Sequence, residues 1–150
     1  MIKAVLLDAG PLGLAVNPHR SPDAEACRTW LDGLLEASIN VIVPEIADYE
    51  VRRELVRAGK RRALARLNAM AVKYDYLPVT TEAWRQAAQF WAQARQQGQP
   101  TAGDRELDGD VILAAQAVTL ALPAGEVVVA TANAGHIGRF TVAKAWQDVP

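Results

Sequence analysis

Short apolar runs alternate with longer segments of helical periodicity along this chain. Each run is about as long as a strand that is buried on both faces of a sheet. Turn-forming residues follow two of the runs: Gly10 and Pro11 come after one, and Pro44 comes after another. A weaker run contains Pro78, which favours an edge strand. The predicted strands cover residues 4–7, 41–43, 76–80 and 127–130, and the tail beyond them carries no strong signal.

Between these runs, apolar positions recur every three to four residues, as on the buried face of a helix. Ser21 and Pro22 mark one helix start, because a capping hydroxyl and a proline in the first turn are typical there. The predicted helices cover residues 22–38, 45–58, 60–73, 81–97 and a stretch from Asp108 or Asp110 to 121, with a loop over 99–106. This alternation predicts a three-layer α/β/α domain with a mainly parallel central sheet, and we expect residues 1–150 to form one domain.

Composition narrows the classes of protein that fit. A net charge of −1 argues against attraction of the whole molecule to nucleic acid, but it leaves room for local basic patches. Cys27 is the only cysteine, which excludes an internal disulfide and a cysteine-based zinc site. No apolar stretch approaches the roughly 20 residues of a membrane span, and the chain does not open on a signal-peptide pattern. We therefore expect a cytoplasmic protein with no membrane partner.

Asp8 is the first candidate functional residue. It follows the buried run 4–7, so it lies at the carboxyl end of a strand, where open α/β sheets place their ligands. A carboxylate in that position needs a partner, and a metal ion is the obvious candidate.

The helix predicted from residue 45 carries the second candidate. Glu50 and Glu54 project inside its apolar arc, whereas Asp48 and Arg52 fall on the opposite, solvent-like face. A solvated acid at the rim of the helix explains Glu50 about as well as a functional role does. The apolar arc itself consists of Ile46, Ala47, Val51 and Leu55.

Asp110 is the third candidate. It shares a helix face with Ala114, Ala117 and Ala121, while Gln116 points elsewhere, and a face of small residues lets a helix approach its neighbour closely. The alternative is that Asp110 and Asp108 only complement the helix N-terminus. The strand 127–130 also ends in a polar turn, although an ordinary turn and a surface histidine explain it equally well. The polar residues of this turn are Thr131, Asn133 and His136.

Together these elements resemble the PIN domain family, and within it the VapC-like toxins of bacterial toxin–antitoxin pairs. Four segments carry the resemblance, in the family's order and across most of the chain: 6–12, 44–55, 110–117 and 129–133. The resemblance implies a PIN-like fold and a metal-dependent endoribonuclease, that is, a hydrolase that cleaves RNA with Mg²⁺ or Mn²⁺. It also implies an antitoxin partner and favours a homodimer, for which the apolar content, with Trp84, Trp91, Leu12 and Leu14 to bury, leaves room.

The resemblance extends to the site residues. Asp8, Glu50 and Asp110 match the family's acidic positions, so they are the expected catalytic residues and metal ligands. Many members carry an aspartate three residues after the asparagine matching Asn133, and here that position is His136. A histidine carries no negative charge and suits Mg²⁺ less than a carboxylate does. Asp108 is therefore a further expected ligand, and the accessory candidates are Asp104, Thr131, Asn133 and His136.

A basic segment completes the prediction. Seven cations occur between residues 52 and 66, against the single acid Glu54, and they could hold RNA phosphates or an acidic segment of an antitoxin. A solvated helical face remains the alternative for any one of them. The expected RNA-binding residues are Arg52, Arg53, Arg57 and Arg61.

Three other classes fit less well. A haloacid-dehalogenase-type phosphatase needs an aspartate at position 10, which is glycine, and a receiver domain needs acids before Asp8, where Val5, Leu6 and Leu7 stand. The strongest rival is a catalytically weak PIN-like module that binds RNA or a protein. An RNase assay with Asp8→Ala distinguishes this module from the enzyme. No feature of the sequence identifies the RNA target.

Overall fold

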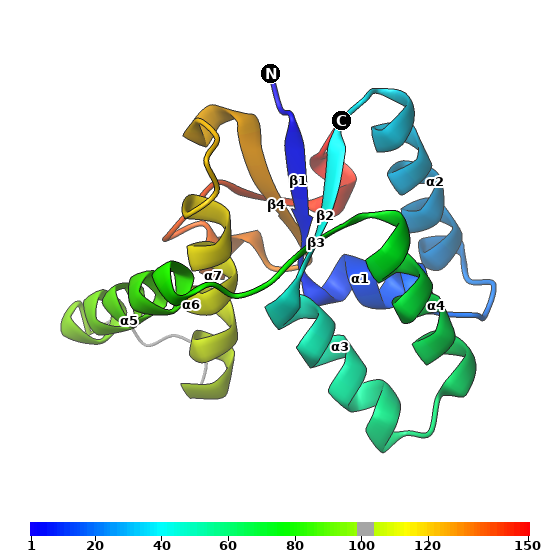
Figure 1. Cartoon of the computed structure of the whole chain (residues 1–150), viewed down its shortest axis with the longest axis horizontal. Coiled ribbons are helices and arrows are strands. Elements are labelled where there is room, and N and C mark those ends of the chain that lie inside the picture. The colour runs from blue at the N-terminus through cyan, green and yellow to red at the C-terminus, as the bar shows by residue number, and fades with distance from the viewer. Residues whose placement is uncertain (99–103) are drawn as a thin grey trace.

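The central sheet of the computed structural model has five strands, all parallel, in the order β3-β2-β1-β4-β5. The model describes residues 1–98 and 104–150. Figure 1 shows β1 in the middle of the sheet, with its neighbours on both sides. The strands are β1 (Ala4–Leu7), β2 (Asn40–Pro44), β3 (Asp75–Leu77), β4 (Val127–Thr131) and β5 (Ala143–Ala145).

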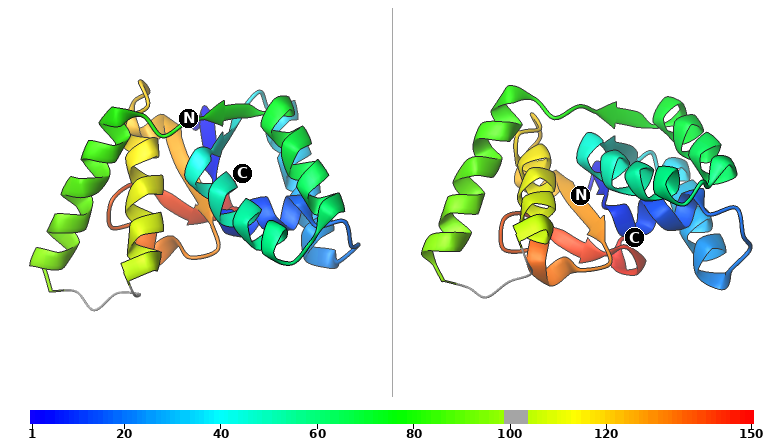
Figure 2. Two further views of the ribbon diagram at one scale, coloured as in Figure 1. Left: turned by 60° about the horizontal axis from the view of Figure 1, so that its bottom comes forward. Right: turned by 90° about the horizontal axis from the view of Figure 1, so that it is seen from below.

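Helices cover both faces of this sheet, which gives the three layers that the strand–helix alternation predicts (Figures 1 and 2). One face packs against α1 (Ala9–Val16), α2 (Pro22–Glu36), α3 (Glu45–Arg57) and α4 (Arg61–Lys73). The other packs against α6 (Asp104–Val118) and α7 (Ala134–Ile137), and α5 (Thr81–Gln96) lies outside α6. Two short 3₁₀ turns, Ala124–Glu126 and Trp146–Asp148, precede β4 and follow β5.

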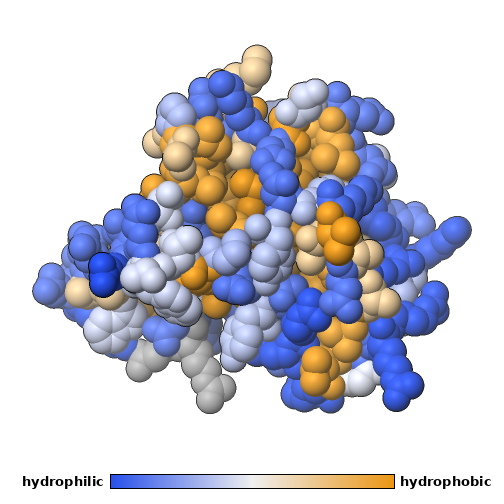
Figure 3. Space-filling view, in the orientation of Figure 1, coloured by the Kyte–Doolittle hydropathy of each residue, from blue (hydrophilic) through white to orange (hydrophobic). Residues whose placement is uncertain are grey.

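Alternating residues of the central strands build the two cores. Val5 and Leu7 of β1 face the α1–α4 layer, whereas Ala4 and Leu6 face α6. Figure 3 shows mostly hydrophilic side chains around the edge of one face of the molecule and hydrophobic patches nearer its centre. No helix within residues 1–98 and 104–150 is long and apolar enough to cross a membrane.

The predicted strands and helices are present, but four features differ. Gly10 and Pro11, predicted as turn formers after Asp8, lie within α1, because Pro11 falls in the first helical turn, where a proline costs no hydrogen bond. The short helix α7 lies where a polar turn was predicted after β4. α6 begins at Asp104, one to two turns before the predicted start. β5 lies in the tail that showed no signal, and it is an edge strand of only three residues.

Candidate active site

β1 delivers Asp8 to the carboxyl edge of the sheet. The chain leaves β1 toward β2 on one side and reaches β4 on the other side, which makes the end of β1 a topological switch point. Asp8 also caps α1, since its Oδ1 accepts a hydrogen bond of 2.7 Å from the backbone N–H of Ala9. The Asp8 side chain is therefore fixed by the start of a helix as well as by the end of a strand.

Thr131, at the end of the neighbouring strand β4, holds the other oxygen of Asp8. Its hydroxyl donates to Asp8 Oδ2 over 2.6 Å, and its own Oγ1 accepts the N–H of Asn133 over 2.9 Å. Thr131 is fully buried. Both carboxylate oxygens of Asp8 thus have a defined donor, and each retains a further lone pair for a ligand.

Glu50 from α3 and Asp110 from α6 approach Asp8 from the two helical layers. Burial and then the charge of Asp8 raise the pKa of Glu50 to about 7, with Asp110 adding to the shift and Arg53 opposing it. Burial and then Asp8 also raise the pKa of Asp110 to about 6, against the lowering effect of His136 and Arg139. The three predicted acids are therefore close enough to repel one another.

Gly109 makes room for Glu50 on the surface of α6. A β-carbon at position 109 would lie 3.0 Å from Glu50 Oε2, which is tighter than most real contacts, so the carboxylate would have to give way slightly. The Glu50 carboxylate therefore packs against the backbone of α6 immediately before Asp110. Sequence reasoning missed this glycine, although a glycine between two aspartates within a helix was the available signal.

His136 lies beside Asp110 rather than away from the site. Its Nδ1 is 3.8 Å from Asp110 Oδ2 and 3.2 Å from the side-chain nitrogen of Asn133. Asn133 Nδ2 can donate to this ring nitrogen only when Nδ1 carries no proton. The structure therefore groups Thr131, Asn133 and His136 around Asp8 and Asp110.

A cavity of about 620 Å³ opens next to Glu50, between α3 and α6. Arg53 and Arg57 line its α3 side, and Asp108 lines its α6 side. Asp108 is exposed, and it lines the same cavity as Glu50. The side chain of Asp104 lies outside the described residues.

The expected RNA-binding arginines have different surroundings. Arg52 donates to both oxygens of Asp48 over 3.0 Å and to Asn68 of α4, so its hydrogen-bonding capacity is largely used within the fold. Arg53 lies 5.2 Å above the ring of Tyr49. Arg57 pairs with Glu54, and Arg61 is exposed at the start of α4.

Two predictions about α3 are wrong. Asp48 is only 6% exposed, because α4 and β3 cover the side of α3 that single-helix periodicity assigned to solvent. Glu54, predicted inside the apolar arc, is exposed and hydrogen-bonded to Arg57. Gln116 of α6 is likewise buried, and it ties α6 to the sheet by donating to Leu77 O and accepting from Ile46 N.

The donor set suits a hard divalent cation. Mg²⁺ and Mn²⁺ prefer oxygen ligands, and Asp8, Glu50 and Asp110 offer carboxylates whose mutual repulsion a dication relieves. In the described part of the chain, no three Asp, Glu, His or Cys side chains converge as a ready-made metal site.

The fold and the site together define an α/β protein with an acidic centre at the switch point of a parallel sheet. The sequence profile of the PIN domain family matches residues 5–137, so the chain belongs to this family. Members of the family are generally nucleases. No curated protein matches the chain significantly.

Three solved structures share the fold. VapBC2 from Rickettsia felis, bound to a DNA fragment from its promoter, has a chain with a TM-score of 0.73 at 14% identity, covering 95% of this chain and 98% of that one. FitAcB from Neisseria gonorrhoeae gives 0.65 at 20% identity, covering 97% and 99%. DNA-bound VapBC from Salmonella typhimurium gives 0.67 at 18% identity, covering 97% and 99%. At these identities the likeness shows the fold alone.

Proposed function

We propose that this chain is a metal-dependent endoribonuclease, formed by residues 1–150 as a single domain and acting in the cytoplasm. One observation carries the proposal: Asp8, Glu50 and Asp110, from three elements far apart in sequence, gather at the carboxyl edge of the sheet, where burial and then the charge of Asp8 raise the pKa of Glu50 and of Asp110. Membership of a family of nucleases supports the same reading. Partly buried carboxylates that repel one another and have raised pKa values are typical of functional sites.

Asp8, Glu50 and Asp110 would hold Mg²⁺ or Mn²⁺, with Asp108 as a further ligand at the edge of the cavity. The cation supplies Lewis-acid polarisation of the phosphodiester and relief of the negative charge that develops during cleavage. Thr131 and the N–H of Ala9 orient the oxygens of Asp8. His136 borders Asp110, and Asn133 lies beside His136, so these two side chains can orient a water molecule there.

Arg53 and Arg57 are the best placed of the expected RNA-binding residues, because both line the cavity beside Glu50. Their charge offsets the repulsion between the acids and RNA phosphates. Arg61 is exposed at the start of α4 and does not line this cavity. Arg52 contributes less in this proposal, since Asp48 and Asn68 already engage it.

The test is cleavage of a mixed-sequence RNA with Mg²⁺ or Mn²⁺ and with EDTA, for the wild type and for Asp8→Asn. We expect cleavage by the wild type only, and only with the cation. Cleavage that survives Asp8→Asn contradicts the proposed centre. RNA binding without cleavage by the wild type favours a catalytically weak RNA-binding module instead, for which His136 in place of an aspartate is the specific observation.

We further propose that the nuclease is the toxin of a toxin–antitoxin pair. The structures that share its fold come from complexes named VapBC and FitAcB, which supports a protein partner of the antitoxin class. Expression of the wild type is expected to arrest growth, and Asp8→Asn is expected not to. Co-expression of a small neighbouring open reading frame should relieve the arrest, and failure of every neighbour to do so argues against the toxin role.

A homodimer is also proposed, through the face of α5 that carries Trp84 and Trp91 beside α6. Trp84 and Trp91 lie seven residues apart, so they share one face of the helix, and they are 52% and 39% exposed. Exposed indoles on one face are typical of protein interfaces. Trp84→Glu should convert a dimer to a monomer in sedimentation analysis, whereas Leu122→Glu, also at an exposed apolar residue, should not.

A further inference from the structure

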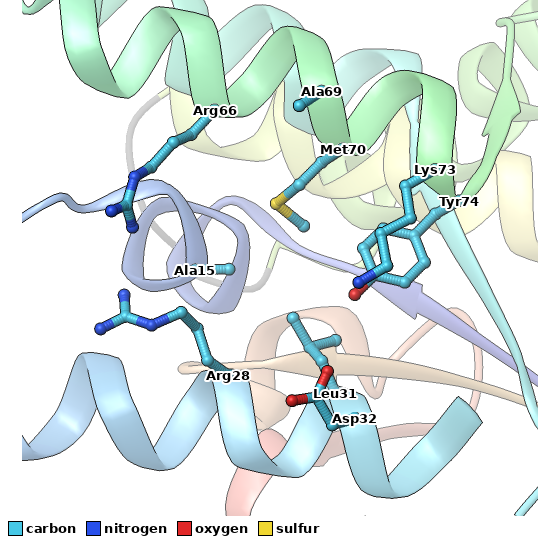
Figure 4. A pocket seen from close by; sticks show the side chains of 9 residues that line it. All are labelled: Ala15, Arg28, Leu31, Asp32, Arg66, Ala69, Met70, Lys73 and Tyr74. Carbon is cyan, nitrogen blue, oxygen red and sulfur yellow. The ribbon is translucent and has the colours of Figure 1, made fainter. Parts of the chain in front are cut away.

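A second hollow lies between α2 and α4, over the C-terminal half of α1, and its volume is about 280 Å³ (Figure 4). It shares no lining residue with the cavity beside Glu50. Its middle is apolar, with Ala15, Leu31 and Met70 facing the open space. Charged side chains stand at its two ends.

Arg28 of α2 and Arg66 of α4 form one end. Both donate to the same backbone carbonyl, that of Asn17 at the C-terminus of α1, over 3.0 and 3.3 Å. Figure 4 shows their guanidinium groups approaching each other from opposite walls. Within residues 1–98 and 106–150, neither guanidinium has a carboxylate at salt-bridge distance.

One carbonyl oxygen cannot satisfy the hydrogen-bonding capacity or the charge of two guanidinium groups. Each guanidinium has five N–H donors, and the carbonyl end of α1 offsets only part of the repulsion between the two positive charges. A phosphate or carboxylate placed between them accepts several charge-assisted hydrogen bonds at once. The pair therefore has the chemistry of an anion site.

The other end of the hollow has a donor and an acceptor. Lys73 stands over the ring of Tyr74, with Nζ 5.3 Å from the ring centroid, and Asp32 lies on the opposite wall. Between this end and the arginines lies the apolar middle. A nucleotide has matching parts in the same order. Its phosphate fits the anion end, the face of its base fits the apolar middle, and the polar edge of its base fits the far end.

We propose that this hollow binds one nucleotide unit, with its phosphate between Arg28 and Arg66 and its base over Leu31 and Met70. The nucleotide is either free or part of an RNA strand, since the chemistry recognised is the same. The hollow lies at the far end of α1 from Asp8, about 12 Å along the helix for eight residues. This inference goes beyond the proposed function, because binding does not require cleavage.

The experiment measures binding alone, with Asp8→Asn protein in EDTA, so that it does not depend on the nuclease proposal. The probes are AMP, CMP, GMP and UMP by calorimetry, and a labelled 12-nucleotide RNA of mixed sequence by fluorescence anisotropy. We expect Arg28→Gln with Arg66→Gln to weaken binding at least about tenfold. Arg62→Gln, which removes an exposed arginine of α4 outside the hollow, should change it less than about twofold.

A second variant tests the base without touching a charge. Ala69 lines the hollow and is exposed, so Ala69→Leu fills part of the space while keeping a good helix former. It should weaken nucleotide binding at least about fivefold and leave binding of inorganic phosphate nearly unchanged. Melting by circular dichroism confirms that each variant is folded.

Every outcome decides the proposal. If the mononucleotides bind and both the arginine variants and Ala69→Leu weaken that binding, the ligand is a free nucleotide. If only the RNA binds and the same variants weaken it, the ligand is a nucleotide within an RNA strand. Equal binding of inorganic phosphate and nucleotides overturns the assignment of a base. Binding that Arg28→Gln with Arg66→Gln does not weaken overturns the site. A Glu-rich 12-residue peptide that binds more tightly than the RNA, and whose binding the same variants weaken, overturns the assignment to a nucleotide.

Discussion

Glu50 packs against residue 109, which has no side chain: a β-carbon there would lie 3.0 Å from Glu50 Oε2, so the carboxylate would have to shift by a few tenths of an ångström. Gly109→Ala should therefore displace the Glu50 carboxylate and lower cleavage at least about tenfold, since small displacements of catalytic groups are costly. The measurement is the cleavage rate at saturating cation.

Gly33→Ala is the matched control for this substitution. Gly33 is an exposed helical glycine with nothing within 4 Å of an added β-carbon. This change should raise the free energy of unfolding by about 0.5–1 kcal/mol and leave cleavage unaltered. Equal cleavage by the Gly109→Ala protein and the wild type would show that Glu50 is not needed where the structure places it.

Thr131→Val removes the hydroxyl that donates to Asp8 and accepts from Asn133. We expect a fall of about tenfold in cleavage and a loss of about 1–2 kcal/mol of stability, because Asp8 loses a donor from the fully buried Thr131 and the N–H of Asn133 loses its acceptor. Thr119→Val is the control, since Thr119 also donates a hydrogen bond, to Ala115 O, but lies at the far end of α6 from Asp110. The control should cleave RNA at the wild-type rate.

Stability of the cation-free protein should fall as the pH rises. The folded state raises the pKa of Glu50 from 4.5 to about 7 and that of Asp110 from 3.8 to about 6, so it retains protons that the unfolded chain releases. The resulting contribution is full below about pH 4 and is lost by about pH 7, and partial exposure limits it to about 1–2 kcal/mol per group.

Urea unfolding between pH 5 and 8 in EDTA measures this slope. Glu50→Gln should flatten it and be more stable than the wild type at pH 8, whereas Glu54→Gln, at an exposed acid, should keep it. A slope unchanged by Glu50→Gln would contradict the repulsion inferred at the site. Mg²⁺ or Mn²⁺ at pH 8 should restore stability, because it binds the folded state only.

The pair of Asp48 and Arg52 should matter for folding and not for chemistry. The side chain of Asp48 is 9% exposed and that of Arg52 is 36% exposed, so Asp48→Ala leaves a half-buried arginine without its partner and should cost about 2–3 kcal/mol. Glu54→Ala breaks a pair that is more than half exposed on both sides and should change stability much less than Asp48→Ala does. At a temperature where both variants are folded, Asp48→Ala should keep the wild-type cleavage rate.

The sequence allowed the fold class to be predicted because the strands near Leu6, Ile42 and Val129 are buried on both faces and are therefore apolar throughout. Asp8 could be proposed because it ends an apolar strand, and Asp110 because it is a charged residue on a helix face of small residues. The burial of Asp48 and the role of Gly109 could not be predicted in the same way. Both depend on which helices pack against each other, and the periodicity of a single helix does not contain that information.

The hydrogen bond between Thr131 and Asp8 joins residues 123 positions apart. The acidic centre therefore belongs to the complete tertiary fold and to no local segment of the chain. Asp8 and Thr131 meet only when β1 has paired with β4, so a partly folded chain that lacks this pairing holds the two side chains apart.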